Sequence, residues 1–297
     1  MKTTRATTLA TFLFILSACT TVSPTHGPEN DMGMLWVKHS ADYKALTRQI
    51  YRNAEMALPR MIADTSWTVL PGQTGAEDLP TAVILDIDDT VVSNIEFQIQ
   101  FERPFTNRKL EMWDREHIAQ PVPGVVEYVA AARAAGVTVF FVTNRPCEKY
   151  PDEDEVCPQK QTVITDLEEL GIAAEPEFVS LSLEKPEWTR EKLVRRQLIG
   201  KDYRIIQLVG DDFGDFVPCA REKVVAPCTT KGTRASRLAA LEDYAEYWGD
   251  MLRWSFGHPV IQQVSDDTVL LAFYAGVPGC LSVQRALVDV TASRSVR

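Results

Sequence analysis

The sequence predicts an α/β protein in which a parallel sheet is covered by helices on both faces. From Ala82 onward, apolar runs of strand length alternate with segments of helical spacing. The runs are almost continuously apolar, which is typical of parallel strands buried on both faces. Polar motifs follow several of the runs, and sheets of this class bind ligands at the carboxyl ends of their strands. A composition of 45% hydrophobic and 24% charged residues in a chain of 297 is ordinary for a globular protein.

The charge of the chain excludes one class of function. Its formal net charge is −10, and Lys and Arg form no cluster of the size that binding of nucleic-acid phosphates requires. We therefore expect no nucleic-acid partner, and an anionic substrate would need a local group of positive charge. The sequence indicates no oligomeric state.

The chain begins with the features of a secretory signal. Residues 1–18 combine basic residues near the start with an apolar stretch from Leu9 to Leu16, which is too short to span a bilayer comfortably. The sequence LSAC that follows is similar to a bacterial lipobox, which predicts that Cys19 carries a lipid and becomes the mature N-terminus. A plain signal peptide and a membrane anchor helix are the alternatives. We expect an exported lipoprotein of the bacterial outer membrane, facing the periplasm or the surface.

Two regions precede the predicted sheet. Residues 19–33 are polar and contain Pro and Gly, so we expect a flexible tether, with order beginning at Met34. From Leu35 to Ala63 the spacing of apolar residues predicts one or two amphipathic helices that pack on the core. A single domain is expected over residues 34–254.

The elements of the sheet region follow from the same patterns. The expected strands are residues 82–87 (AVILDI), 137–142 (VTVFFV), 177–181 (EFVSL), 203–210 (YRIIQLVG) and 223–226 (KVVA). The expected helices are residues 123–136, 160–171 and 187–200, which carry apolar residues at helical spacing.

Three carboxylates, Asp86, Asp88 and Asp89, come directly after the first predicted strand. Residues two apart in an extended chain point to the same side, so Asp86 and Asp88 are expected to face one site. Two bare carboxylates would repel each other there, whereas a hard divalent cation would bind between them. The pattern therefore favours Mg²⁺, against the ordinary alternative of a helix cap or turn.

Other polar residues follow the neighbouring strands. They are Thr143 and Asn144 after the second strand, Lys192 in a basic helix, and Asp211, Asp212 and Asp215 after the fourth strand. Each alone has an ordinary explanation as a cap, a strand-end hydroxyl or a solvated helix face. Their order along the chain is a more specific signal than any single member.

With these motifs the sequence resembles the haloacid dehalogenase (HAD) superfamily, whose four motifs are matched by DIDDT, VTNR, Lys192 and GDDFGD. It is most similar to the class C acid phosphatases, which are bacterial outer-membrane lipoproteins, over about residues 34–254. The resemblance implies a Rossmann-like three-layer α/β/α core with a parallel sheet, a small, mostly helical cap inserted at roughly 95–121, and an N-terminal helical extension.

The resemblance also implies roles for the acidic residues. Asp86 would be the nucleophile that becomes an aspartyl phosphate, and Asp88 the acid and base, holding a proton at the working pH. Mg²⁺ would be bound by the Asp86 side chain, the Asp88 backbone carbonyl and Asp211. Asp215 would orient this shell, with Asp212 as a further second-shell candidate.

The remaining roles concern the substrate. Thr143, Asn144 and Lys192 would hold the transferred phosphoryl oxygens. Lys185, in LEKPEW, is the rival of Lys192. Trp113 would stack on a nucleoside base, although a core Trp is a nearly equal alternative. Phe97 and Phe105 are weaker candidates for the same stacking.

Five cysteines remain after Cys19. In an oxidising compartment the close pairs Cys147/Cys157 and Cys219/Cys228 could form disulfides, which leaves Cys280 as the odd cysteine with no close pairing candidate.

Past YAEYWGDMLRW the chain departs from the family, because residues 255–297 lack its Asn-Pro-x-Tyr stretch. Two alternatives stay open, a diverged tail and translation out of frame, and we expect residues after Ser255 to pack poorly.

The sequence thus predicts an Mg²⁺-dependent acid phosphatase for small phosphomonoesters, with 5′-nucleotides as the substrates that the family implies. The alternatives are a phosphatase for non-nucleotide esters and a catalytically weak surface lipoprotein that binds nucleotides or protein partners.

Overall fold

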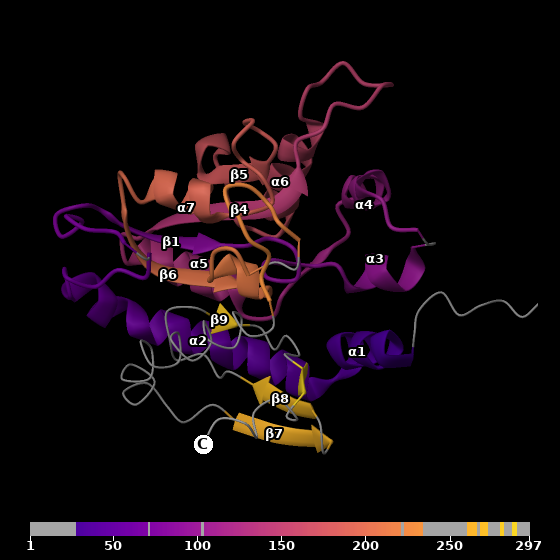
Figure 1. Cartoon of the computed structure of the whole chain (residues 1–297), viewed down its shortest axis with the longest axis horizontal. Coiled ribbons are helices and arrows are strands. Elements are labelled where there is room, and N and C mark those ends of the chain that lie inside the picture. Colours follow the sequence, from indigo (N-terminus) through magenta and orange to yellow (C-terminus); the bar gives the residue numbers. More distant parts are fainter. Residues whose placement is uncertain are drawn as a thin grey trace, which may run out of the picture.

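A computed structural model describes residues 28–233, apart from 71, 102–103 and 221–222, and the backbone of four short strands between Val260 and Asp289 (Figure 1). The expected signal peptide, Cys19 and the first part of the expected tether lie outside the described residues. So does most of 255–297, where poor packing was expected. No helix among the described residues has both the length and the apolar character that crossing a bilayer needs.

Two helices form the N-terminal extension, as the apolar spacing predicted. They are α1 (Pro28–His39) and α2 (Ala41–Ala63). Ser40 separates them, and its hydroxyl accepts hydrogen bonds from the first backbone N–H groups of α2, which is the usual way to begin a helix. The expected tether is therefore shorter than predicted, because α1 already begins at Pro28 and not at Met34.

The central sheet has five parallel strands in the order β5-β4-β1-β6-β9. Its strands are β1 (Thr81–Leu85), β4 (Thr138–Pro146), β5 (Val179–Ser182), β6 (Arg204–Gly210) and β9 (Cys280–Leu281). Four of the predicted strands are confirmed. The separate strands β7 (Val260–Ser265), β8 (Thr268–Ala272) and β10 (Leu287–Asp289) form a small antiparallel sheet.

The prediction of a strand at residues 223–226 was wrong. These residues form a loop within the segment that the Cys219–Cys228 disulfide closes, and Val224 is exposed. An apolar run becomes a strand only when a neighbouring strand and two covering layers bury it, and here β9 occupies the place beside β6.

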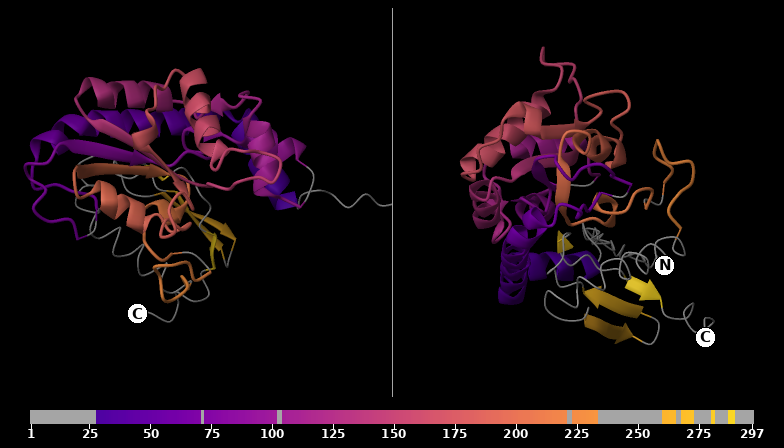
Figure 2. Two further views of the ribbon diagram at one scale, coloured as in Figure 1. Left: turned by 90° about the horizontal axis from the view of Figure 1, so that it is seen from above. Right: turned by 90° about the vertical axis from the view of Figure 1, so that its left-hand side faces the viewer.

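Helices cover both faces of the sheet, so the predicted three-layer architecture is confirmed. Val83 and Leu85 belong to the core beneath α2, α5 (Val125–Ala134) and α6 (Pro158–Glu169). Ala82 and Ile84 alternate with them and belong to a second core beneath α7 (Leu193–Ile199). The left view of Figure 2 shows the indigo and magenta helices on one side of the sheet and the orange α7 on the other.

Helix α2 is tied to the sheet by buried polar contacts as well as by apolar packing. The Tyr51 hydroxyl donates a hydrogen bond of 2.7 Å to the Thr90 carbonyl, in the turn that follows β1. Arg204 of β6 donates to the carbonyls of Met61 and Asp64 at the end of α2, and to that of Trp67 in the loop that follows. The helix thus supports the turn that carries the first acidic motif.

A small cap stands beside the sheet, as predicted (Figure 1). It comprises α3 (Ile95–Gln100) and α4 (Asn107–Asp114), and the short strands β2 (Val92–Ser93) and β3 (Gln120–Pro121) form its neck. Glu111 of α4 accepts a hydrogen bond of 2.9 Å from the Thr162 hydroxyl of α6, which docks the cap on the core.

Both close cysteine pairs form the disulfides that their spacing suggested, Cys147–Cys157 and Cys219–Cys228. The first closes the loop between β4 and α6, and the second closes the loop beyond β6.

Candidate active site

The acidic motifs meet at the carboxyl ends of β1 and β6. Asp86 follows β1, and its backbone N–H donates to the Val209 carbonyl of β6 at 2.8 Å. Asp211 follows β6, and Asp215 ends the 3-10 turn η2 (Phe213–Asp215). One carboxylate oxygen from each of Asp86, Asp211 and Asp215 lies within 4.8 Å of the others. We call these three residues the acidic cluster.

Two carboxyl groups of the acidic cluster are costly to ionise even though the Lys192 ammonium lies beside them. Burial, opposed by Lys192 and reinforced by Asp215 and Asp88, raises the pKa of Asp86 to about 7. Burial also raises the pKa of Asp211 well above its ordinary value, with Asp86 and Asp215 adding to the effect. Because hard divalent ions take carboxylate ligands, these residues fit Mg²⁺ or a similar ion. Asp215, expected to lie behind the ligands, belongs to the same cluster as Asp86 and Asp211.

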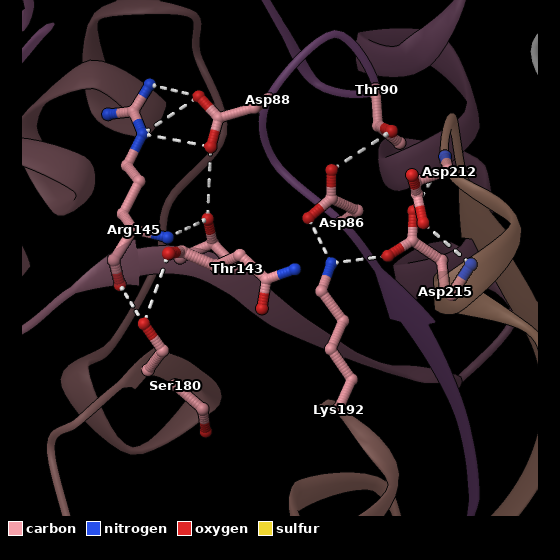
Figure 3. Close-up of polar contacts among 12 residues, drawn as sticks. Asp86, Asp88, Thr90, Thr143, Arg145, Ser180, Lys192, Asp212 and Asp215 are labelled. Atoms are coloured by element: carbon pink, nitrogen blue, oxygen red, sulfur yellow. Dashed lines mark hydrogen bonds and ion pairs between the residues drawn. The ribbon is translucent and has the colours of Figure 1, made fainter. Parts of the chain in front are cut away.

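Lys192 lies inside this site. It precedes the first residue of α7, and its ammonium contacts Asp86 Oδ1 and, at 2.7 Å, Asp215 Oδ1 (Figure 3). Only 3% of Lys192 is exposed. Lys185, its rival, is exposed instead and lies over the Trp188 ring with 4.5 Å between Nζ and the ring centroid. Of the two lysines, the structure places Lys192 beside the acidic cluster.

Asp212 stabilises the η2 turn through hydrogen bonds within it. Its Oδ1 accepts a hydrogen bond of 2.7 Å from the Gly214 N–H, and its own N–H donates to Asp215 Oδ2 at 3.0 Å. These bonds hold the η2 turn in the shape that brings Asp215 back over the end of β6.

Gly210, the last residue of β6, allows Asp215 to occupy its position. A Cβ added at Gly210 would lie 2.2 Å from Asp215 Oδ2 and 2.4 Å from Asp215 Cβ.

We expect Gly210→Ala to displace Asp215 and to lower kcat/KM by about 10²-fold, because a misplacement of about 1 Å has effects of this size. Steady-state kinetics measure the loss. Gly33→Ala is the control, because a Cβ there meets nothing within 4 Å, and equal activities of the two variants would contradict the prediction.

Asp88 faces a different set of partners from Asp86. Its carboxylate accepts hydrogen bonds from Asn94 Nδ2 at 2.7 Å, Arg145 Nε at 3.0 Å and the Thr143 hydroxyl at 3.2 Å. The chain turns sharply directly after Asp88, because Asp89 has a left-handed φ of 56°. Figure 3 shows Asp88 directed toward Arg145 and Thr143, and Asp86 toward Lys192.

The surroundings of Asp88 favour its ionised form. Burial alone would raise the pKa of Asp88, but Arg145, Asn94 and Thr143 together hold that pKa below its ordinary value. The ionised carboxylate is therefore favoured at Asp88, whereas the sequence led us to expect a carboxyl group that holds a proton. The difference arises from Arg145, which is part of VTNR but to which the sequence assigned no role.

The two phosphate-binding candidates on β4 diverge. The Thr143 hydroxyl donates to Asp88, and Thr143 is fully buried. The Asn144 side-chain carbonyl instead accepts a hydrogen bond of 3.2 Å from Arg195, which also donates to the Ser180 carbonyl at 3.1 Å. Successive residues of a strand point to opposite sides, and this places Thr143 and Arg145 together and Asn144 apart from them.

Trp113 is a buried member of an aromatic cluster in the cap. Only 8% of it is exposed, and its ring centroid lies 5.7 Å from that of Phe97. This placement favours the core alternative over base stacking. Phe105, by contrast, is 50% exposed and meets Phe97 edge to face at 6.2 Å.

Comparison with known proteins agrees with this geometry. Residues 20–245 match the model of a family described as HAD superfamily, subfamily IIIB (Acid phosphatase). Two solved structures are similar in fold, the class C acid phosphatase from Bacillus anthracis and the same enzyme with tungstate bound. Each is 22% identical, covers 73% of this chain and 79% of its own, and has a TM-score of 0.55.

Proposed function

Because the chain belongs to the HAD superfamily, subfamily IIIB, and is thus an acid phosphatase, we propose that it hydrolyses small exported phosphomonoesters, 5′-nucleotides among them, through a phosphorylated Asp86 and with Mg²⁺. The observation that carries the proposal is the position of Asp86, which is buried, contacts Lys192 and lies beside the other two carboxylates of the acidic cluster, Asp211 and Asp215. A carboxylate in such a position is available as a nucleophile, and the adjacent ammonium matches a phosphoryl group.

In the first half of the reaction, an Asp86 oxygen attacks phosphorus, a bond forms between them, and the bond from phosphorus to the ester oxygen breaks. Lys192 moves from Asp86 to the phosphoryl oxygens, and the Thr143 hydroxyl is the second donor near them. The charge that develops on these oxygens is stabilised by fixed donors and cations.

Asp88 transfers protons in both halves of the reaction. The hydrogen bonds from Arg145, Asn94 and Thr143 favour its ionised form, so the proton for the leaving oxygen is proposed to arrive with the substrate. Below about pH 6 a phosphomonoester retains one proton, which it can pass to Asp88. Asp88 then protonates the leaving alkoxide. Afterwards it accepts a proton from the water whose oxygen bonds to phosphorus as the bond from phosphorus to Asp86 breaks, and it passes this proton to the departing phosphate.

The metal would be held by the carboxylates of Asp86 and Asp211 with the Asp88 backbone carbonyl, and Asp215 lies within reach of the same position. A bound divalent cation supplies positive charge that offsets both the carboxylates and the phosphoryl oxygens.

Binding of Mg²⁺ is expected to release protons, because the pKa of Asp86 is raised to about 7 and that of Asp211 is raised as well. Both groups hold protons at acid pH, so a metal ion must displace them. Apparent affinity should therefore fall as pH falls through 7, by roughly 10- to 100-fold between about pH 8 and about pH 5.

Calorimetric titration of the metal-free protein in buffers of different ionisation enthalpy measures both the affinity and the protons released. Asp211→Asn should weaken binding and release fewer protons, and exposed Asp202→Asn is the matched control. Equal affinity at both pH values would show that these carboxylates do not hold the ion.

The function itself is tested with a substrate panel. An aryl phosphate, 5′-nucleotides and alkyl phosphates are incubated with protein that has been treated with a chelator and then supplied with Mg²⁺ or with none. Metal-dependent release of phosphate supports the proposal. Activity that persists without any metal would remove the role of Mg²⁺, and preference for non-nucleotide esters would redirect the substrate class.

We also propose that the protein is exported and anchored by a lipid on Cys19. Two disulfides among the described residues support export, because such bonds persist in oxidising compartments. Metabolic labelling with a radioactive fatty acid should label the protein and fail to label Cys19→Ser. Labelling of both would place the lipid elsewhere.

A further inference from the structure

Arg145 joins three carboxylates that come from three different parts of the fold. Its guanidinium lies 3.0 Å from Asp88, 3.1 Å from Asp114 of the cap helix α4, and 3.3 Å from Asp166 of α6. Only 4% of the Arg145 side chain is exposed, and the side chains of Asp114 and Asp166 are buried as well. The cap, the core and the catalytic turn therefore meet at one guanidinium.

The guanidinium is suited to fixing orientation. It is planar and presents its donors in a rigid fork, unlike the single ammonium of lysine. With Asp114 and Asp166 holding one end, the side that faces Asp88 has little freedom to rotate. The Arg145 Nε and Nη2 groups both approach Asp88 Oδ1, while Thr143 contacts Oδ2.

We propose that Arg145 is a positioning residue for Asp88, and that Asp114 extends this control to the cap, so that docking of α4 sets the orientation of the acid–base carboxylate. The proposal rests on the proposed function of Asp88. It assigns to the cap a task in the chemical step, in addition to covering the site.

A plain anchoring role is the competing explanation, and the cap provides its own comparison. Glu111 lies on the same helix, is equally buried, and bonds to Thr162 of α6 and to Arg115. Like Asp114, it docks the cap through a buried carboxylate. Glu111, however, has no contact with Arg145 among the interactions of the described residues, so it can anchor the cap without reaching Asp88.

The two roles separate when leaving groups are compared. An alkyl phosphate needs a proton on its departing oxygen much more than an aryl phosphate does, so loss of a well-placed acid lowers turnover of the alkyl ester more. A cap that is merely loosened should affect both esters alike. The readout is therefore the ratio of kcat/KM for glycerol 2-phosphate to kcat/KM for 4-nitrophenyl phosphate.

We expect Asp114→Asn and Arg145→Lys to lower this ratio by about 10-fold or more, in the direction of Asp88→Asn, which should lower it by about 10²-fold or more. Arg145→Lys keeps the charge and loses the fork, and Asp114→Asn keeps the shape and removes the carboxyl group that faces the guanidinium. Glu111→Gln should leave the ratio unchanged, whatever it does to stability. Thermal unfolding of each variant shows whether the fold persists.

The outcomes distinguish the two proposals. An unchanged ratio in Asp88→Asn would contradict the proposed acid role of Asp88 itself. A lowered ratio in Asp88→Asn with unchanged ratios in Asp114→Asn and Arg145→Lys would overturn only the positioning role. Equal changes in Asp114→Asn and Glu111→Gln would show that cap docking in general, and not the path through Arg145, is responsible.

Discussion

Asp86→Asn is expected to lower phosphatase turnover by at least ~10³-fold, the scale of removing a covalent nucleophile. The amide has the shape of the carboxyl group, so Lys192 and Asp215 keep their ion pair. It has, however, neither the charge nor the nucleophilic oxygen that forms the bond to phosphorus. Release of phosphate from an aryl phosphate at saturating Mg²⁺ measures the loss.

The same substitution should not weaken the metal-free fold at neutral pH. The pKa of Asp86 in the folded protein, about 7, lies above its ordinary value, so ionised Asp86 costs stability as the pH rises toward 7. An Asn at this position removes that cost. Thermal unfolding near pH 7 checks this, and exposed Asp202→Asn is the control for activity. Comparable turnover in Asp86→Asn and Asp202→Asn would sink the covalent mechanism.

Lys192→Ala is expected to lower kcat/KM by about 10²- to 10³-fold, the range for removing one fixed donor from a charged transition state. The substitution also leaves the acidic cluster without the ammonium that contacts Asp86 and Asp215. Binding of inorganic phosphate, followed as competitive inhibition, should weaken in parallel because the cation that attracts the anion is gone.

Lys185→Ala is the matched control and decides between the two lysines that the sequence offered. Lys185 is exposed and stacks on Trp188, outside the acidic cluster. Its removal should change kcat/KM by less than about twofold, as expected for a surface side chain. A large loss in Lys185→Ala together with a small one in Lys192→Ala would reverse the assignment.

Near-continuous apolar runs that alternate with helical patterns predicted the sheet and the meeting of its acidic ends. Leu85 and Val209 lie in near-continuous apolar runs, and parallel strands bring their carboxyl ends to one edge. The proximity of Asp86 and Asp211 could therefore be predicted from the sequence. The helices followed from the same local signals, with boundaries shifted by several residues, whereas the cap was expected from the resemblance to the family.

The contacts of Asp88 could not be predicted in the same way. Arg145 meets Asp114 and Asp166 only because α4 and α6 pack against each other, and no local pattern encodes that approach. One signal was available: Arg145 lies two residues after Thr143 on a strand, so it had to share its side of the sheet. The buried guanidinium also explains why the charge state expected for Asp88 differed from that in the structure.

If the protein is anchored through Cys19 as proposed, the support that α2 gives to the catalytic turn limits how it can be released from the membrane. Tyr51 holds the Thr90 carbonyl, and Arg204 binds the last carbonyls of the helix. A protease that sheds the enzyme in working form must therefore cut ahead of Ala41. Cleavage inside α2 would release a fragment in which the helix no longer supports the turn that carries Asp86. The apolar face of the sheet that α2 covers would then be exposed to solvent, which promotes aggregation.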